Sequence, residues 1–369
     1  MTRLMVVGGG YSGVVAAKLA AKWTDATVTL INDNDRFVER VRLHQLVAGQ
    51  QLRDLPLRDL LDGSGVELVV DQVKAIDPEA KKLHLALEKE PVSYDILVYA
   101  AGSLADLDSV PGAAEHAYSV ATYDQAVRLR DHLVDAQSVT VVGGGLTGIE
   151  TAAELAESRP DLKVRLVTNG VLGETLSQRG QRHLRRALSR LGVDVRENAR
   201  VTEVRADGVV LADDHHLPAD TVIWTAGFRV PTLARDAGLA VDHHGRMVVD
   251  ETLRSVSHPD VYGVGDAAAI RRPDGQELRM ACATGLPTAQ QAMRALADRL
   301  AGRTPRPVRF RYAFQCISLG RRDGLIQFVR PDDSPRELVL TGRLAALYKE
   351  AIVRGIILVE RRPTLPAGW

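Results

Sequence analysis

The chain has 369 residues, and its 47 Lys and Arg balance 47 Asp and Glu to a formal net charge of zero. This balance gives no overall attraction to nucleic acid, so we expect no nucleic-acid partner. The length allows two or three domains, and two distant cysteines favour a reducing cytoplasm over a disulfide framework. No apolar run approaches the roughly 20 residues of a membrane-spanning helix, and the first strand begins too early to leave room for a signal peptide.

The N-terminal part of the chain has the pattern of a nucleotide-binding unit. An apolar strand leads into a glycine-rich loop at residues 8–13, and a helix follows. Because glycine has no Cβ atom, the backbone N–H groups at the start of such a helix can approach a pyrophosphate. The predicted elements are strands at 4–7, 26–31 and 94–99, a helix at 14–22, and a turn at Ala101 and Gly102.

The same plan recurs later in the chain, with the second glycine loop beginning 135 residues (143 − 8) after the first. One glycine loop is a weak signal, but two loops in strand–turn–helix context predict two bound nucleotides. The repeated elements are a strand at 139–142, a loop at 143–148, a helix at 149–157, and a strand at 221–225 that ends in Ala226 and Gly227.

The rest of the chain returns to the first unit and then forms a smaller region. A strand at 259–264 ends in Gly265-Asp266, and a helix is predicted to begin with Pro287 at its first position. Pro305 and Pro307 mark a boundary before a region of roughly 60 residues with a strand at 324–330 and a helix at 343–354. The predicted fold is α/β, with two Rossmann-like domains (1–108 with 249–304, and 109–248) and an α+β region at 305–369.

As a set, these motifs resemble the flavoprotein reductases that bind two dinucleotides. Residues 148–150, 223–227 and 286–290 make the chain similar to type II NADH:quinone oxidoreductases and to apoptosis-inducing-factor-like NAD(P)H:quinone reductases. The resemblance implies FAD in the first site and NADH or NADPH in the second. It also implies hydride transfer to the flavin, a quinone-like acceptor, a homodimer, and a cytoplasmic protein in peripheral contact with the inner face of the membrane.

The resemblance assigns roles to individual residues. Glu150 would face the nicotinamide and the flavin, and the helix start with Thr288 and Gln290 would stabilise the reduced flavin through its positive end. Asp266 would bind the FAD ribityl chain. The implied FAD contacts are Gly8, Gly10, Tyr11, Ser12, Gly13, Asn32, Asp33, Arg42, Ala101, Gly102, Gly265, Asp266, Pro287, Thr288 and Ala289. Those of the nicotinamide dinucleotide are Gly143, Gly145, Leu146, Thr147, Gly148, Thr168, Ala226 and Gly227.

Simpler interpretations exist for several of these residues. Asp266 could cap a helix, and Glu150 could stabilise the start of its own helix. Arg294 stands where family members often carry a second glutamine, which leaves the acceptor open. Arg42, together with Arg40 and His44, forms a basic cluster that could hold an acidic acceptor or stabilise reduced flavin, or be a solvated loop face. The histidine pairs at 215–216 and 243–244 are interpreted as turns, so no metal site is predicted.

The preferred nicotinamide dinucleotide stays open at this point. Asn32-Asp33 follows the second strand of the first unit, where the family usually places an acid first. In the second unit Thr168-Asn169 holds that place without an acid, which removes the usual bar to a 2′-phosphate. The next arginine along the chain is Arg179.

Other functions are compatible with the same motifs. One is a soluble flavin reductase or dehydrogenase acting on a specialised metabolite, and another is a nucleotide-sensing flavoprotein without turnover. A sulfide:quinone type of chemistry would use Cys282 and Cys316, whereas buried inert thiols are the plainer interpretation. Apolar residues recur in the last helix at Leu344, Leu347, Tyr348, Ala351 and Ile352. They predict a helix packed on the first domain or one that docks at a membrane.

Overall fold

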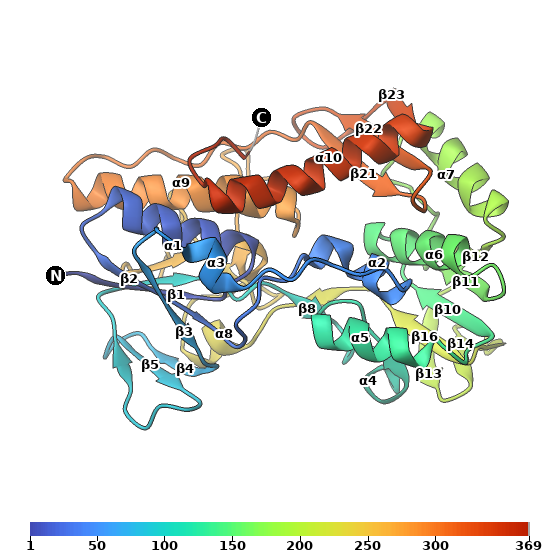
Figure 1. The fold of residues 1–369 in the computed structure, drawn as a ribbon, viewed down its shortest axis with the longest axis horizontal. Coiled ribbons are helices and arrows are strands. Elements are labelled where there is room, and N and C mark those ends of the chain that lie inside the picture. The colour runs from blue at the N-terminus through green and yellow to red at the C-terminus, as the bar shows by residue number, and fades with distance from the viewer. Residues whose placement is uncertain (368–369) are drawn as a thin grey trace.

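The computed structural model describes residues 1–367, so the last two residues of the predicted C-terminal region, 368–369, lie outside the described part. Two five-stranded parallel sheets occupy opposite ends of an elongated molecule (Figure 1). The first has the order β19-β7-β1-β2-β3, from β1 (Arg3–Val7), β2 (Thr27–Asn32), β3 (Val66–Val70), β7 (Ile96–Tyr99) and β19 (Val261–Gly263). The second has the order β12-β11-β10-β16-β9, from β9 (Ala117–Tyr118), β10 (Ser138–Val142), β11 (Lys163–Val167), β12 (Asp194–Arg196) and β16 (Thr221–Trp224).

These strands form because their apolar residues are buried on both faces of each sheet. Leu4 and Val6 in β1 and Val139 and Val141 in β10 are almost fully buried. Parallel strands covered by helices on both sides have such continuous apolar runs. The helix after each glycine loop, α1 (Tyr11–Trp23) or α6 (Leu146–Ser158), packs on its own sheet. The predicted α/β class with two Rossmann-like units is therefore confirmed.

The chain crosses between the two units at a short antiparallel pair of strands. β8 (Leu104–Ala105) pairs with β17 (Phe228–Arg229). Buried residues that follow β17, such as Leu239 and Met247, pack in one cluster with Met5 of the first sheet. The return crossing thus lies earlier than the boundary predicted at 248, because these apolar side chains are buried by the first unit.

Smaller elements complete the two units. Two three-stranded antiparallel sheets flank them, formed by β4 (Val73–Asp77), β5 (Lys82–Leu85) and β6 (Val92–Ser93), and by β13 (Val201–Arg205), β14 (Gly208–Leu211) and β15 (His216–Pro218). β18 (Met247–Val248) pairs with β20 (Ala268–Ala269). The remaining short helices are η1 (Arg40–Arg42), α2 (Leu43–Val47), α3 (Leu57–Leu61), α4 (Ala113–His116), α5 (Tyr123–His132), α8 (Leu233–Asp236) and η2 (Gly265–Ala267), and α7 (Gln178–Arg190) is longer.

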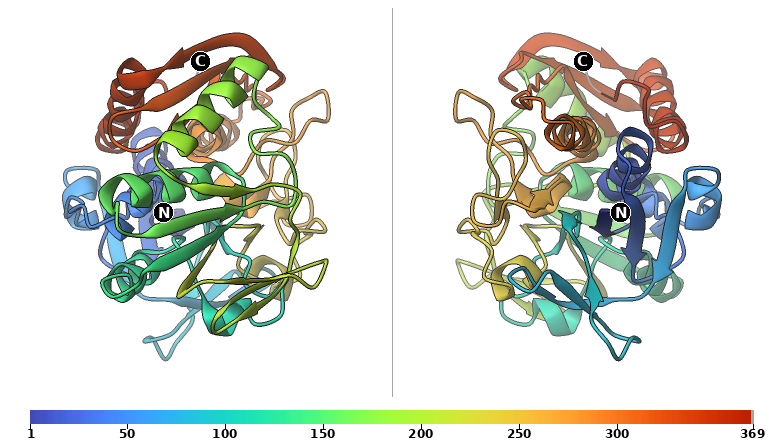
Figure 2. Two further views of the ribbon diagram at one scale, coloured as in Figure 1. Left: turned by 90° about the vertical axis from the view of Figure 1, so that its right-hand side faces the viewer. Right: turned by 90° about the vertical axis from the view of Figure 1, so that its left-hand side faces the viewer.

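The C-terminal region lies over the same side of both units (Figures 1 and 2). It consists of the antiparallel sheet β21 (Phe314–Ser318), β22 (Gly324–Val329) and β23 (Pro335–Thr341), followed by α10 (Gly342–Arg361). α10 contacts α1 and α3 of the first unit, whereas β21 contacts α6 and β23 contacts α7 of the second. This region therefore joins the two units on one side.

Two helix predictions were wrong in detail. α9 (Cys282–Leu300) begins at Cys282, so Pro287 lies inside the helix rather than at its first position. Pro287 is tolerated because it lies near the start, where the proline ring and its missing N–H affect only Ala283 in the first turn.

The last helix also buries a different face from the one predicted. In α10 the buried positions include Ala345, Lys349, Val353 and Glu360, whereas Leu344 and Leu347 are 67% and 66% exposed. The apolar pattern was misleading because two ionisable side chains lie on the inner face. Lys349 pairs with Glu150 of α6, and burial raises the pKa of the Glu360 carboxyl, which favours its neutral form.

Candidate active site

The two glycine loops adopt the same turn. Gly8 and Gly143 have φ values of +106° and +124°, a region that favours glycine. A Cβ atom on Gly13 would lie 1.8 Å from the carbonyl oxygen of Gly8, and one on Gly148 would lie 1.9 Å from that of Gly143. Each helix thus packs so closely on its own loop that only glycine fits.

The starts of both helices are suited to an anion. A Cβ atom on Gly10 or Gly145 would meet nothing within 4 Å, so open space lies before each helix. Neither of these N-cap residues has a side-chain cap, and neither helix has an acid in its first turn. The first N–H groups therefore remain available, and the residues present fit a dinucleotide pyrophosphate in each loop.

Asn32 stabilises the first glycine loop through a hydrogen bond. Its Oδ1 atom accepts a hydrogen bond of 2.6 Å from the backbone N–H of Gly9, and its Nδ2 atom donates to the carbonyl oxygen of Asn34 at 2.9 Å. Asp33 next to it is exposed. Asn32 thus stabilises the loop, whereas the exposed Asp33 side chain can contact a ribose at this strand end. The contacts of both residues with FAD stay predictions.

Asp266 lies in a polar group at the end of β19. Its Oδ2 atom accepts a hydrogen bond from the Ser103 hydroxyl at 2.7 Å, and the Arg40 guanidinium lies 4.0 Å away. Asp266 is in the short helix η2, where no side-chain cap is made, so the helix-cap interpretation is wrong. A Cβ atom on Gly265 or Gly285 would approach the Ser12 hydroxyl to 2.7 or 2.6 Å. The first loop, the Gly265-Asp266 turn and α9 therefore meet at Ser12.

The structure gives Thr288 and Gln290 structural partners. Thr288 is fully buried, and its hydroxyl donates to the carbonyl oxygen of Thr284 at 2.7 Å. The Gln290 amide donates to the carbonyl oxygens of Pro363 and Leu365 and so holds the C-terminal tail. With the helix beginning earlier, residues 282–285 occupy its first turn, which sequence reasoning missed. The roles of Thr288 and Gln290 toward the flavin stay predictions.

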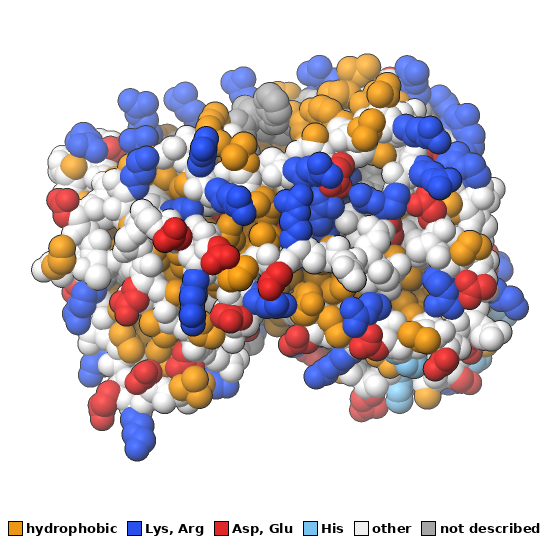
Figure 3. Space-filling model, in the orientation of Figure 1, with side chains coloured by type: hydrophobic (Ala, Val, Ile, Leu, Met, Phe, Trp, Pro, Cys, Tyr) orange, Lys and Arg blue, Asp and Glu red, His pale blue; other side chains and the backbone are white. Residues whose placement is uncertain are grey.

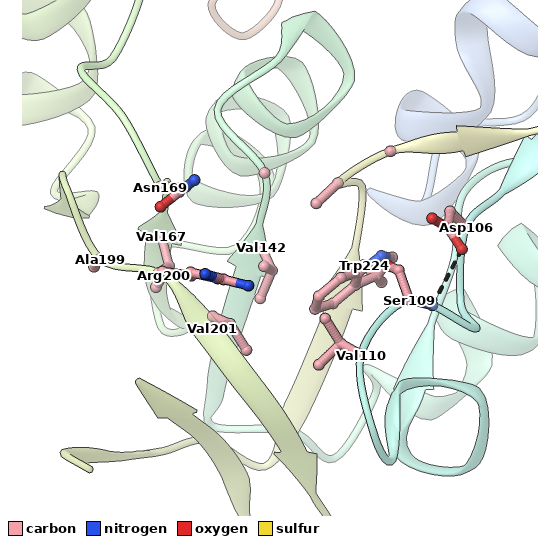
Figure 4. A pocket seen from close by; sticks show the side chains of 13 residues that line it. Asp106, Ser109, Val110, Val142, Val167, Asn169, Ala199, Arg200, Val201 and Trp224 are labelled. Atoms are coloured by element: carbon pink, nitrogen blue, oxygen red, sulfur yellow. Dashed lines mark hydrogen bonds between the residues drawn. The ribbon is translucent and has the colours of Figure 1, made fainter. Parts of the chain in front are cut away.

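The second loop borders an open pocket of about 270 Å³ (Figure 4). A Cβ atom on Gly144 would lie 2.4 Å from the hydroxyl oxygen of Thr168, so Thr168 packs directly against this loop. Asn169 and Arg200 are exposed in the pocket wall. The lining residues are Asp106, Ser109, Val110, Val142, Gly143, Val167, Asn169, Ala199, Arg200, Val201, Trp224, Ala226 and Gly227. Arg200 carried no local sequence signal, because the fold brings it to this strand end.

Glu150 lies at the contact between α6 and the C-terminal region. Its Oε1 atom is paired with the Nζ atom of Lys349 in α10 and accepts a hydrogen bond of 3.0 Å from the Ser318 N–H. Nδ1 of His44 lies 3.9 Å from Oε2. Glu150 and Lys349 are each 8% exposed. Lys349, which sequence reasoning missed, makes this a buried ion pair across two elements, so Glu150 does more than stabilise its own helix.

Burial and ion pairing shift the pKa of Lys349 in opposite directions. Burial lowers the pKa of Lys349, but the attraction of Glu150 outweighs it, so that the pKa is raised and Lys349 stays an ammonium ion. One turn further along α6, burial raises the pKa of Glu154 to about 7. Glu154 is bound by the Gln50 amide, and its Oε2 atom has no partner within residues 1–367. A carboxyl that changes protonation near neutral pH thus lies beside the buried pair.

The predicted basic cluster is not a solvated loop face. Burial lowers the pKa of His44 to about 4, so His44 is neutral near pH 7. Arg42 is bound by Glu350 at 2.9 and 3.0 Å and by Glu39 at 3.2 Å. Arg40 lies by Ser103 and Asp266 instead. The cluster is therefore split by its partners, and Arg42 serves the contact with α10; its predicted contact with FAD stays untested.

Both cysteines are free thiols close to the ion pair. Burial raises the pKa of Cys282 to about 12 and also raises that of Cys316. A thiolate is the reactive form of cysteine, so both groups are held in the unreactive form. Across residues 1–367, no group of three or more His, Cys, Asp and Glu side chains could hold a metal ion. Over the same residues, no helix is long and apolar enough to cross a membrane.

Comparison with known proteins gives a consistent result. A family model described as pyridine nucleotide-disulphide oxidoreductase matches residues 2–295. An NADH dehydrogenase-like protein of Mycobacterium tuberculosis is 34% identical over 79% of each chain. A demethylphylloquinone reductase of Synechocystis is 26% identical, covering 94% of this chain and 92% of the relative. The fold is also similar to that of NDH2 from Plasmodium falciparum in complex with NADH, with a TM-score of 0.82, 15% sequence identity and 98% of each chain covered.

Proposed function

The chain belongs to the pyridine nucleotide-disulphide oxidoreductase family, and from that premise we propose that it passes electrons from NAD(P)H to a membrane quinone. It is an FAD-dependent NAD(P)H oxidoreductase. FAD, when bound, supplies the redox chemistry by accepting a hydride and passing two electrons on. The protein contributes binding, orientation and proton supply.

The two loops support different roles for the two nucleotides. α1 is enclosed by α9 and α10, which suits a cofactor that stays bound. The second loop opens onto the pocket of about 270 Å³, which suits a dinucleotide that enters and leaves at each turnover. We therefore assign FAD to the first loop and NAD(P)H to the second.

The buried ion pair of Glu150 and Lys349 is the observation that carries the quinone assignment. Reduction of a quinone to a quinol takes two electrons and two protons. Lys349, as an ammonium ion, is paired with Glu150 in a buried site, and Glu154 lies one helical turn away. Because burial raises the pKa of Glu154 to about 7, this carboxyl can hold a proton near neutral pH and replace one that Lys349 donates.

An exposed apolar surface supports a membrane as the source of the quinone. Leu338, Leu344, Leu347 and Tyr348 form this surface on β23 and α10, with exposed fractions between 37% and 67%. Figure 3 shows hydrophobic and basic side chains gathered over this part of the molecule. Apolar side chains beside arginines, such as the exposed Arg343, are typical of peripheral docking on anionic lipid. We therefore propose peripheral contact with the membrane through the C-terminal region.

Anaerobic reduction followed by reoxidation tests the activity. The protein is reduced with NADPH or NADH in a stopped-flow instrument, and a menaquinone analogue is then added. We expect flavin bleaching in the first step and recovery of oxidised flavin in the second. In Glu150→Gln the first step should keep its rate and quinone reoxidation should slow by about tenfold or more, as expected for a lost proton donor. Equal slowing with ferricyanide, which needs no proton, would contradict this role.

Vesicle flotation tests the docking surface. Leu344→Glu with Leu347→Glu should abolish binding to vesicles that contain anionic lipid and menaquinone. Leu87→Glu is the matched control, because Leu87 is 80% exposed but lies outside this surface, between β5 and β6. Gel filtration of the same variants tests whether this apolar surface instead binds a second copy of the chain. Loss of a dimer without any change in vesicle binding would assign the surface to self-association and contradict membrane docking.

A further inference from the structure

Arg200 places an unpaired cation in the second nucleotide pocket. Its side chain is exposed and points into the pocket beside Asn169 (Figure 4). Within residues 1–367 its guanidinium group makes no hydrogen bond and no ion pair. Most arginines near this strand end are paired, for example Arg185 with Glu197 at 2.6 Å. A free guanidinium in a binding pocket is a donor without an acceptor, and it therefore points to an anionic ligand group.

The backbone fixes Arg200 next to the strand end where a ribose is read. The N–H of Ala199 donates to the carbonyl oxygen of Thr168 at 2.9 Å, and the N–H of Asn198 donates to that of Gly170 at 3.2 Å. The carbonyl oxygen of Arg200 accepts from the N–H of Ala212 at 2.8 Å. Rossmann-like domains bind the adenosine ribose at the end of this second strand. Arg200 therefore lies at the ribose end of the pocket and does not depend on a mobile loop for its place.

The residues of the pocket wall favour an anion there. Thr168 and Asn169 follow β11, so the place of the acid that usually binds the ribose hydroxyls holds no carboxylate. Glu174 lies near Gly170 but is not among the residues that line the pocket. Glu197 is neutralised by Arg185 and also accepts from the N–H of Leu172 at 2.6 Å. Asp106, the acid in the pocket wall, lies on the opposite side from Arg200 in Figure 4.

We propose that this pocket selects NADPH over NADH, with Arg200 and the amide of Asn169 binding the 2′-phosphate of the adenosine ribose. The inference rests on the assignment of the second loop to the hydride donor and does not depend on the acceptor. An arginine close to the second strand end is the usual means of accepting a 2′-phosphate, and guanidinium–phosphate pairs are strong because both groups are charged.

Fragment binding tests the proposal without any turnover. The FAD-loaded protein is titrated by calorimetry with 2′,5′-ADP, which carries the 2′-phosphate, and with 5′-AMP, which lacks it. We expect 2′,5′-ADP to bind about tenfold tighter or more, the range of one charge-assisted contact. In Arg200→Gln that advantage should disappear while 5′-AMP binds as before, which also shows that the variant is folded. Arg205→Gln is the matched control, because Arg205 is exposed at the end of β13, the strand that follows Arg200, but is paired with Glu203 and lies outside the pocket wall.

Two outcomes would overturn the proposal. Equal affinity of the natural protein for 2′,5′-ADP and 5′-AMP would show that the pocket does not recognise the 2′-phosphate. Equal weakening of both fragments in Arg200→Gln would show that Arg200 supports the pocket and does not select its ligand. Selective binding of 2′,5′-ADP by a protein that fails to reduce quinone would uphold this inference and contradict only the proposed acceptor.

Discussion

The two glycine loops have the same turn, but their surroundings differ. Both begin with a left-handed glycine, and both have a glycine on which a side chain would overlap the loop backbone. The helix after the first loop, α1, packs between its sheet and α9 and also contacts α10. The second opens onto a pocket lined by Asn169 and Arg200. Equal motifs thus lie in unequal surroundings, and the neighbouring elements set that difference.

Lys18 joins the helices that pack around the first unit. Its Nζ atom donates to the carbonyl oxygens of Leu60, Glu360 and Arg361, at 2.6, 2.9 and 3.0 Å. These acceptors lie at the ends of α3 and α10, so one ammonium group on α1 joins three helices. A cation near the last carbonyl groups of a helix also stabilises its negative end. The sequence does not predict that Lys18 is buried, because lysine side chains are usually exposed to solvent.

The largest expected effect separates the two loops by function. In Gly13→Ala the added methyl group would overlap the carbonyl oxygen of Gly8, and we expect loss of FAD with incomplete folding. In Gly148→Ala the same overlap occurs with Gly143, and we expect retained FAD but flavin reduction slowed by about a hundredfold or more, since the dinucleotide is no longer positioned. Flavin absorbance after purification and anaerobic reduction measure the two effects. Loss of FAD from both variants would remove the distinction between the sites.

The next effect concerns the pair that joins the second unit to α10. Lys349→Met leaves Glu150 buried without its cation, and we expect the free energy of unfolding to fall by about 3–5 kcal/mol. The double variant Glu150→Gln with Lys349→Met should recover most of that loss, because no unpaired charge remains buried. Urea denaturation of the natural protein and the three variants gives the comparison. Additive losses in the double variant would show that the two residues act independently.

Glu154 should make stability depend on pH. Its folded pKa of about 7 lies above its ordinary value of 4.5, so the folded protein binds this proton more tightly than the unfolded chain. The contribution is fully present below about pH 4.5 and is lost as the pH rises through 7. Glu154→Gln should therefore be more stable than the natural protein at pH 8, by about 2–3 kcal/mol, with the difference vanishing near pH 4. Thermal unfolding at several pH values measures it, and a constant difference would exclude titration of Glu154 as the cause.

The smallest effect tests the support beneath the first loop. Asn32→Ala leaves the N–H of Gly9 without its acceptor, and we expect FAD affinity to fall by about fivefold, corresponding to about 1 kcal/mol. Asp33→Asn, which leaves that hydrogen bond in place, serves as the comparison for the ribose reader. Fluorescence titration of the apoprotein with FAD gives both values. A larger loss in Asp33→Asn would show that ribose contact matters more than loop support.

Much of the fold follows from local patterns. The strands at 4–7 and 139–142 and the helices after both loops lie within a few residues of their predicted places. A glycine turn after an apolar strand is defined by neighbouring residues, so it can be recognised without knowledge of the rest of the molecule. The helix start at Cys282 was missed because Pro287 usually marks a first position, and nothing local shows that the preceding turn is already helical.

The candidate site was predictable only in part. Glu150 was identified from its place after the second loop, but Lys349 lies 199 residues further along the chain (349 − 150) and has no motif of its own. The apolar positions of α10 suggested the wrong buried face, since Leu344 and Leu347 are exposed while Lys349 and Glu360 are buried. A burial pattern derived from hydropathy assumes that ionisable side chains face water. This assumption fails for Lys349, whose charge is compensated by Glu150 on another element, and for Glu360, where burial raises the pKa and favours the neutral carboxyl.

The sequence by itself indicated two dinucleotide sites in an α/β fold, because two glycine loops, each between a strand and a helix, are local structures that neighbouring residues define. Only the tertiary structure decided which elements pack around each loop, which face of α10 is left exposed, and that Arg200 lies beside the end of β11. Each of those features depends on residues that are distant in the chain and adjacent in space. Burial, ion pairing and access to a pocket are properties of such contacts, so they arise only when the elements pack together.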